Sequence, residues 1–377
     1  MLRSVDLVDR APLLTVLPET GDASDWRWQV RNAVTDLARL ESLIELSAAE
    51  KIGVSRALGE GFPMSITPYY LGLVDPHNPD CPIRKQCIPV ENESFEVEGD
   101  LRDPLGEEAH EVAPHLVQRY PDRVLLLATD RCSVYCRFCT RSRMVGAGGG
   151  ARSMETLSQA FAWLREHPEV RDVIVSGGDP LVMNSDRLAH VLEELARIES
   201  VMYVRVATRA PVTLPQRITD ELCKALRRHP AVWIMTHFNH PKELTAESRA
   251  ACARLVDAGL PVMNQSVLLR GVNDDAATLE TLFRELVRSR VRPYYLLQAD
   301  PVRGTGHLRT SIETGLRIME ALQGRVSGIA LPKYIVDTPG GLGKVPMQRN
   351  PIVSADGPRT TLRTFRGDLV DYIDPPH

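Results

Sequence analysis

From about residue 124 onward, short apolar runs alternate with amphipathic stretches, and this alternation limits the possible folds more than any other feature of the chain. A strand joined through a helix to its neighbour runs parallel to it, so the pattern predicts repeated βα units and a parallel sheet. Six units predict an incomplete (βα)6 barrel of the α/β class, a partial TIM barrel with its chemistry at the C-terminal strand ends. A doubly wound sheet is the alternative. The expected strands are Val124 to Ala128, Val173 to Val175, Val201 to Ala207, Val232 to Thr236, Val262 to Leu268 and Pro293 to Gln298.

The regions on either side of this pattern differ from it and suggest three segments. Residues 1–115 combine a helical opening, Trp26 to Leu58, with the proline-rich stretch ITPYYLGLVDPHNPDCPIRKQC, and they predict a helical segment that wraps the barrel or forms an oligomer contact. Residues 116–330 form the expected barrel. Residues 331–377 predict a C-terminal segment with a glycine-rich turn. Its expected strands are Tyr334 to Asp337, Thr360 to Phe365 and Leu369 to Tyr372.

The charge balance argues against several classes of partner. The chain of 377 residues has 45 basic and 49 acidic side chains, a net charge of -4 and no basic stripe, so no nucleic-acid partner is expected. The opening residues lack the pattern of a signal peptide, and no run of 18 apolar residues follows. We therefore expect a soluble cytoplasmic protein that has no membrane partner.

Three of the seven cysteines lie within eight residues, in the sequence TDRCSVYCRFCTRSR directly after the first barrel strand. These are Cys132, Cys136 and Cys139. Three thiolates are one short of the sets that complete a structural zinc site or an ordinary iron–sulfur cluster, so a [4Fe–4S] cluster bound here would keep one iron open. An incomplete zinc site and three packed cysteines are the alternatives. Simple packing is expected for Cys81, Cys87, Cys223 and Cys252.

The C-x3-C-x2-C spacing at this place in a six-unit barrel resembles the radical S-adenosylmethionine (radical SAM) superfamily. The resemblance implies a [4Fe–4S] cluster whose open iron binds S-adenosylmethionine and whose electron generates a 5′-deoxyadenosyl radical. The second strand ends in a matching segment, formed by Ser176, Gly177, Gly178 and Asp179. In the superfamily this segment contacts the methionine amino group. Glycine there would let a ligand approach the backbone, where exposed N–H groups can hold a carboxylate.

The tail holds a second informative stretch, IVDTPGGLGK, which ends at Lys344. Its glycines suggest a phosphate-binding turn, but Val345 stands where a nucleotide-binding loop requires Ser or Thr. A lysine on a flexible glycine turn suits a Schiff base with an aldehyde cofactor, because the lysine must move away when substrate displaces it.

Together these features resemble the lysine 2,3-aminomutase family from about Ile66 onward. The resemblance implies an isomerase that uses a [4Fe–4S] cluster, S-adenosylmethionine and pyridoxal 5′-phosphate to move the 2-amino group of an amino acid to carbon 3. The expected reaction converts L-lysine to β-lysine. A flavodoxin or ferredoxin as reductant and a homodimer or homotetramer are also expected. The matching stretches are ITPYYLGLVDP, RYPDRVLLLATDRCSVYCRFCTR, VSGGDPL, PVTLPQRIT, THFNHP, NQSVLLRGVND, RPYYLLQAD and VDTPGGLGK.

The resemblance also implies roles for individual residues. Lys344 would form the internal aldimine, Arg123 would hold the cofactor phosphate, and Arg141 would pair with the substrate carboxylate. Asp300 and Asp337 would bind the distal ammonium group of the substrate. The residue types suit these roles, because an arginine fork matches a carboxylate and two converging carboxylates repel each other unless a cation lies between them. Two further positions, expected in the cofactor pocket beside S-adenosylmethionine, are His237 and Gln265.

Two departures from the family pattern bear on the site. No cysteine follows Cys252, so the zinc site that some members carry near the C-terminus is not expected, and Leu297 replaces a tyrosine of the cofactor pocket. Arginine stays open as an alternative substrate. Glutamate is disfavoured because two aspartates would face its side chain. A non-catalytic protein that binds a cluster or a metal is the alternative from another class, and it would have no need of Lys344 or Arg141.

Overall fold

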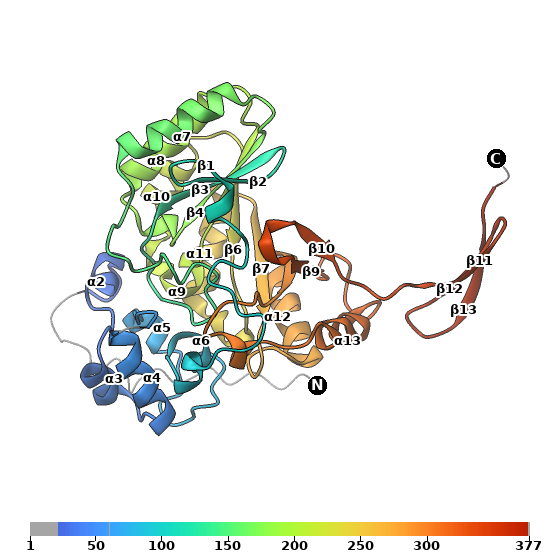
Figure 1. The fold of residues 1–377 in the computed structure, drawn as a ribbon, viewed down its shortest axis with the longest axis horizontal. Helices are drawn as coiled ribbons and strands as arrows, with labels where there is room; N and C mark the ends of the chain where they lie inside the picture. The colour runs from blue at the N-terminus through green and yellow to red at the C-terminus, as the bar shows by residue number, and fades with distance from the viewer. Residues whose placement is uncertain (1–21, 60, 376–377) are drawn as a thin grey trace.

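A ten-stranded sheet in the order β1 to β10 organises the computed structural model, which describes residues 22–59 and 61–375 (Figure 1). Strands β3 to β9 run parallel, and antiparallel strands extend both edges. The strands are β1 (Glu111–Ala113), β2 (Leu116–Tyr120), β3 (Arg123–Thr129), β4 (Asp172–Gly177), β5 (Tyr203–Ala207), β6 (Val232–Thr236), β7 (Val262–Leu268), β8 (Arg292–Gln298), β9 (Lys333–Asp337) and β10 (Lys344–Pro346).

Helices cover the outer side of this sheet and alternate with its parallel strands (Figure 1). They are α7 (Met154–Glu166), α8 (Ser185–Ala196), α9 (Ala210–Thr213), α10 (Asp220–Leu226), α11 (Ala246–Asp257), α12 (Ala276–Arg288) and α13 (Ile312–Leu322). Side-chain caps fix the start of the longer ones; Ser153, for example, accepts a hydrogen bond from the Thr156 N–H at the start of α7. Short 3₁₀ helices lie at Glu91–Ser94, Glu108–His110, Pro180–Val182, Pro215–Arg217, Pro241–Glu243, Gly306–Leu308 and Pro339–Gly341.

The six predicted βα units and the partial barrel are confirmed. Strands β6 and β7 match their predicted residues at both ends. The sheet is larger than predicted, however, since β9 joins it as a further parallel strand and the sequence pattern did not reveal β1, β2 or β10. The sheet therefore continues past both ends of the expected barrel segment, 116–330.

The N-terminal segment forms several short helices where one helical stretch was expected. They are α2 (Trp26–Arg31), α3 (Leu37–Leu43), α4 (Ala48–Gly59), α5 (Pro68–Leu71) and α6 (Arg84–Cys87), gathered against one side of the barrel (Figure 1). The Thr67 hydroxyl donates to the Thr213 carbonyl over 2.7 Å, and the Tyr70 hydroxyl donates to Glu243 over 2.8 Å. The segment thus shares buried polar contacts with barrel residues that follow β5 and β6.

The barrel is open, and side chains bridge the gap between its two edges. Arg119 of β2 donates to Asp337 of β9 over 2.7 Å, and the Lys344 N–H of β10 donates to the Tyr120 hydroxyl over 3.0 Å. These contacts bring the last strands of the sheet against the first ones without backbone pairing between them.

The last three strands form a separate antiparallel sheet that projects from the body (Figure 1). They are β11 (Ile352–Asp356), β12 (Arg359–Arg363) and β13 (Leu369–Ile373). The two strands predicted here, β12 and β13, are confirmed, and β11 was missed. Among the helices of residues 22–59 and 61–375, none is long and apolar enough to cross a membrane.

Candidate functional site

All of the predicted site residues line one cavity of about 360 Å³ inside the barrel. Strands β2 to β9 contribute to its wall, as do the loop after β3 and Lys344 at the start of β10. Parallel strands direct their C-terminal ends toward one side of a barrel, which explains why residues far apart in sequence meet here.

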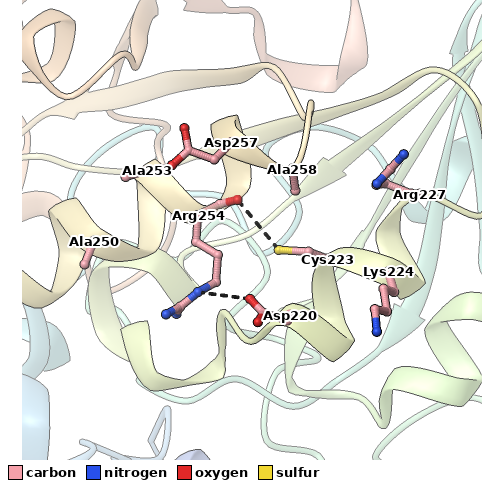
Figure 2. A pocket seen from close by; sticks show the side chains of 9 residues that line it. All are labelled: Asp220, Cys223, Lys224, Arg227, Ala250, Ala253, Arg254, Asp257 and Ala258. Carbon is pink, nitrogen blue, oxygen red and sulfur yellow. Dashed lines mark hydrogen bonds and ion pairs between the residues drawn. The ribbon is translucent and has the colours of Figure 1, made fainter.

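A groove of about 520 Å³ between α10 and α11 lies elsewhere, on the helical layer (Figure 2). Arg254 reaches Asp220 across it over 3.4 Å, and the Cys223 thiol points to the Arg254 carbonyl. None of the predicted site residues lines this groove.

The cysteine triplet lies in the loop between β3 and α7, and contacts from the N-terminal segment hold this loop. The Tyr135 N–H donates to the Ser65 carbonyl over 3.0 Å, and the Arg137 N–H donates to the Gln86 carbonyl over 2.9 Å. Cys132, Cys136 and Cys139 are half-buried free thiols.

Burial affects the ionisation of two of these thiols. Burial raises the pKa of Cys132 well above its usual value, with the Asp179 charge adding to the effect, and burial raises the pKa of Cys139 to about 11. A metal would deprotonate such thiols by supplying the missing positive charge. The described residues contain no group of three His, Cys, Asp or Glu side chains placed around a single ion. Thiolates that bind three different irons need not converge on one point.

Arg209, which follows β5, connects the triplet to a buried polar network that sequence reasoning missed. Its guanidinium donates to the Cys136 Sγ over 2.8 Å, to Gln86 over 2.6 Å and to Glu243 over 2.7 Å. The backbone N–H of Arg209 donates to Asp179 over 2.8 Å. A polar residue at the C-terminal end of a barrel strand was the available signal.

The glycine pair after β4 does not expose its amides as expected. The Gly178 N–H donates to the Thr129 carbonyl and the Asp179 N–H donates to the Arg131 carbonyl, each over 2.7 Å, so the prediction of free N–H groups here is wrong. A side chain at Gly177 would lie 2.1 Å from the Thr129 oxygen, so glycine permits close packing of β4 on the end of β3. The Asp179 carboxylate is buried and accepts from Thr208 over 2.7 Å.

Lys344 and Asp337 lie directly opposite each other in the β9–β10 pair. The Lys344 ammonium group forms an ion pair with one carboxylate oxygen of Asp337, and Arg119 binds the other. Burial would raise the pKa of Asp337, but the hydrogen bonds and charges of Arg119 and Lys344 outweigh it and lower the pKa. Asp337 is therefore ionised.

Asp300, two residues after β8, differs from Asp337 in its partners and in the direction of its pKa shift. Its half-buried carboxylate faces the cavity and takes part in no hydrogen bond or ion pair with the residues that the structure describes. Burial, with the neighbouring Asp337 charge, raises the pKa of Asp300 to about 7. A carboxylate in this position favours binding of a cation.

Two arginines, each paired with an aspartate, lie at the Arg123 end of the cavity. The Arg123 guanidinium lies 4.3 Å from the centre of the Tyr120 ring and donates from Nε to Asp122 over 3.0 Å, and Arg205 pairs with Asp172 over 2.6 Å. Six cationic side chains line the whole cavity against four carboxylates, a balance that suits an anionic ligand such as a phosphate. The cations are Arg119, Arg123, Arg141, Arg205, Arg209 and Lys344.

Arg141 is held by a carboxylate that sequence analysis did not identify. Glu107, which is buried, accepts from the Arg141 Nε over 2.9 Å and from its Nη2 over 2.8 Å. The Arg141 Nη1 donates to the Ser176 hydroxyl over 3.3 Å. The two partners are 34 residues apart in sequence and belong to different predicted segments, so no local motif links them.

His237, Gln265 and Leu297 complete the wall between these groups. The His237 ring lies 5.4 Å from that of Phe138, and burial together with the Arg209 charge lowers its pKa to about 3, so the ring is neutral. Leu297 places an apolar side chain on the cavity.

Comparisons with known proteins agree on one family. Residues 126–282 match the radical SAM superfamily, and residues 319–377 match the lysine-2,3-aminomutase family. The L-lysine 2,3-aminomutase of Clostridium subterminale is 46% identical over 94% of this chain and 85% of that protein. The corresponding protein of Bacillus subtilis is 45% identical over 93% and 74%. A glutamate 2,3-aminomutase of Clostridioides difficile is 42% identical over 97% and 86%.

Among solved structures, a radical SAM methyltransferase from Sphaerobacter thermophilus superposes with a TM-score of 0.44 and 24% identity, over 59% of this chain and 68% of that chain.

The Arg119–Asp337 contact generates a stability prediction. Because both side chains are nearly buried (10% and 8% exposed), we expect a double-mutant cycle of Arg119→Ala and Asp337→Asn to give a coupling of about 1–3 kcal/mol in urea unfolding. The exposed pair Arg290–Asp257 is the matched control and should show no measurable coupling. Equal coupling in the two pairs would contradict a bridging role for Arg119.

Proposed function

Because the chain belongs to the lysine 2,3-aminomutase family, an isomerase family of the radical SAM superfamily, we propose that it converts L-lysine to β-lysine. The observation that supports lysine is the Asp300 carboxylate, which lies on the cavity beside Asp337 without a cationic partner of its own. The distal ammonium group of lysine would supply that cation.

Family membership alone does not select this substrate, since relatives named for lysine and for glutamate have similar identity to this chain. The charges favour a cationic side chain over that of glutamate. A glutamate side chain would bring a third carboxylate toward Asp300 and Asp337, and two like charges in one desolvated site repel strongly.

Residues of the cavity fit the three cofactors that the family uses. Cys132, Cys136 and Cys139 would hold the cluster, Lys344 would carry pyridoxal phosphate, and Arg123 would bind its phosphate. When bound, the cluster and S-adenosylmethionine supply the radical, and pyridoxal phosphate supplies the π system across which nitrogen moves. The segment expected beside S-adenosylmethionine comprises Ser176, Gly177, Gly178, Asp179, His237 and Gln265.

The other side chains would orient the substrate. Arg141 would bind the α-carboxylate, while Asp300 and Asp337 bind the ammonium group, so the substrate is held at both ends and its C2 and C3 are placed between the cofactors. Burial of the cavity inside the barrel excludes water from reactive radicals.

We also propose a flavodoxin or ferredoxin as the electron donor, a cytoplasmic location, and three functional segments: 1–115, 116–330 and 331–377.

The thiol assignment predicts iron content. Cys136→Ala should lose the cluster, because the remaining two thiolates bind only two of the four irons. The measurement is iron per chain in anaerobically purified protein, about four in the wild type. Cys252→Ala, which changes a buried cysteine of α11, is the control and should retain iron. Full iron content in Cys136→Ala would exclude this ligand.

The lysine assignment predicts where pyridoxal phosphate attaches. Borohydride reduction should fix the cofactor on the peptide that contains Lys344, as measured by mass spectrometry, and Lys344→Ala should lose it while retaining iron. Lys333→Ala, which changes an exposed lysine of β9, is the matched control. Labelling of another lysine in the wild type would overturn the assignment.

The substrate assignment predicts a loss of selectivity. Asp300→Asn should reduce the preference for lysine over norleucine by about tenfold to a hundredfold, because one charge-assisted hydrogen bond contributes about 1.5–3 kcal/mol. Anaerobic kinetics with lysine, arginine, norleucine and glutamate measure this preference. Asp274→Asn, outside the cavity, is the control. Wild-type turnover of glutamate or norleucine as fast as lysine would refute the cation site.

A pH dependence follows from the same carboxylate. The pKa of Asp300 in the free protein is raised to about 7, and a bound ammonium group stabilises only the ionised form. Lysine affinity should therefore rise between pH 6 and pH 8 and level off above, whereas Asp300→Asn should lose this rise.

The C-terminal sheet supports assembly into a homo-oligomer. Cross-strand partners lie on the same face of a sheet, and the pairs Ile352–Leu362 and Leu362–Val370 therefore gather apolar side chains on one face. Tyr372 joins them, because it lies two residues beyond Val370. No other part of residues 22–59 and 61–375 buries this face, where Ile352, Val370 and Tyr372 are exposed.

We propose that a second copy of this chain covers the apolar face, because the same patch on two projecting arms can pack about a twofold axis in a closed pair. Leu362→Asp should shift the protein to monomers in sedimentation velocity. Ser354→Asp, on the opposite face of the same sheet beside Thr361 and Asp371, should not. A monomeric wild type would contradict the proposal.

A further inference from the structure

A strap formed by residues 100–110 leads from the N-terminal segment to the cavity, which Leu105 and Glu107 line, and it contacts residues at or near three of the predicted site residues. The Leu101 N–H donates to the Pro301 carbonyl over 2.8 Å, next to Asp300. The Gly340 N–H donates to the Pro104 carbonyl over 2.8 Å, in the turn before Lys344. Glu107 binds Arg141, so this one segment touches the surroundings of each predicted substrate contact.

The strap leaves little freedom around Glu107. A side chain at Gly106 would lie 3.0 Å from the Gly340 oxygen, and one at Gly341 would lie 2.7 Å from the Leu105 oxygen. The His110 ring bonds to the Gly106 carbonyl over 2.6 Å. Backbone packed this tightly fixes the position of the Glu107 side chain that it carries.

Glu107 contacts only one edge of the Arg141 guanidinium. It accepts from Nε and from one N–H of Nη2, and Ser176 accepts one N–H of Nη1. A guanidinium has five N–H groups, so one remains on each Nη atom. No second acceptor for either Nη atom is found in the part of the chain that the structure describes, and two N–H groups of one guanidinium can bind the two oxygens of a carboxylate.

The same carboxylate also holds a second arginine. Glu107 accepts from the Arg143 Nη2 over 3.1 Å, and Arg143 is bound further by Asp103 and Glu108. Burial would raise the pKa of Glu107, but the charges of Arg141 and Arg143 outweigh it and lower the pKa, so Glu107 is ionised.

We propose that Glu107 is a positioning residue for substrate recognition, which turns the free edge of Arg141 toward the cavity so that it binds the α-carboxylate of the substrate in a fork. This inference rests on the proposed role of Arg141 as the carboxylate contact. Glu107 itself touches no substrate. It acts by fixing the orientation of a side chain that otherwise has many rotamers.

The test compares two ligands that differ only at the α-carboxylate, lysine and lysinamide. Equilibrium dissociation constants are measured anaerobically at one pH on enzyme that holds its cluster and pyridoxal phosphate but no S-adenosylmethionine, so that no turnover occurs. Both oxygens of Glu107 accept from Arg141, so Glu107→Gln removes the charge and one of these acceptors and weakens the hold on the Arg141 guanidinium. The preference for lysine over lysinamide should fall about tenfold, the scale of one charge-assisted hydrogen bond.

Glu108→Gln is the matched control, because Glu108 is the adjacent carboxylate, half-exposed and bound to Arg143 but not to Arg141. It should keep the wild-type preference. Thermal unfolding of both variants, with Glu107→Asp as a second test variant that retains the charge, separates a loss of folding from a loss of recognition. Glu107→Asp should retain more of the preference than Glu107→Gln.

Three results would overturn the inference. An equal loss for both ligands in Glu107→Gln would assign Glu107 a role in folding only. Tighter lysine binding would show that Glu107 competes with the substrate for Arg141. If Arg141→Ala lost the preference for lysine over lysinamide but Glu107→Gln kept it, the positioning role of Glu107 would be refuted and the role of Arg141 would stand. An unchanged preference in Arg141→Ala would instead refute the carboxylate contact in the proposed function.

Discussion

The contact of Asp337 with Arg119 and Lys344 joins the two ends of a sheet that does not close by backbone pairing. A complete barrel has no free edges, whereas this sheet leaves a gap between its first and last strands. Two cations from opposite edges meet at one buried carboxylate in that gap. These contacts fix the distance between the two edges of the sheet where Lys344 lies.

The same contact sets the electrostatic contrast inside the cavity. Asp337 has two cationic partners and a lowered pKa, whereas Asp300 has none and a raised one. The pKa values of the two carboxylates thus differ because their surroundings differ. Asp337 holds the edges of the sheet together, whereas Asp300 is the carboxylate that is free to bind a ligand. A site with an unpaired carboxylate at Asp300 and a guanidinium at Arg141 suits a ligand that carries a charge of each sign.

Much of this arrangement could be predicted from the sequence, because it follows from strand order. Apolar runs such as Val232 to Thr236 define strands, and residues at their C-terminal ends meet at one side of a barrel, so the cysteines, His237 and Asp300 could be placed together. The partners of these residues could not. Glu107 and Arg119 reach the cavity from segments whose path depends on tertiary packing. No periodic pattern in the sequence predicts that path. The glycine pair shows that one motif can have two explanations. It suggested contact with a ligand, but glycine is also required there because β4 packs closely against the end of β3.

The cavity wall ends at Lys344, and no residue of the projecting C-terminal sheet contributes to it. Sequence change in that sheet is therefore released from the constraints that catalysis imposes on the barrel. Substitutions in β11, β12 and β13 would therefore change no side chain that lines the cavity.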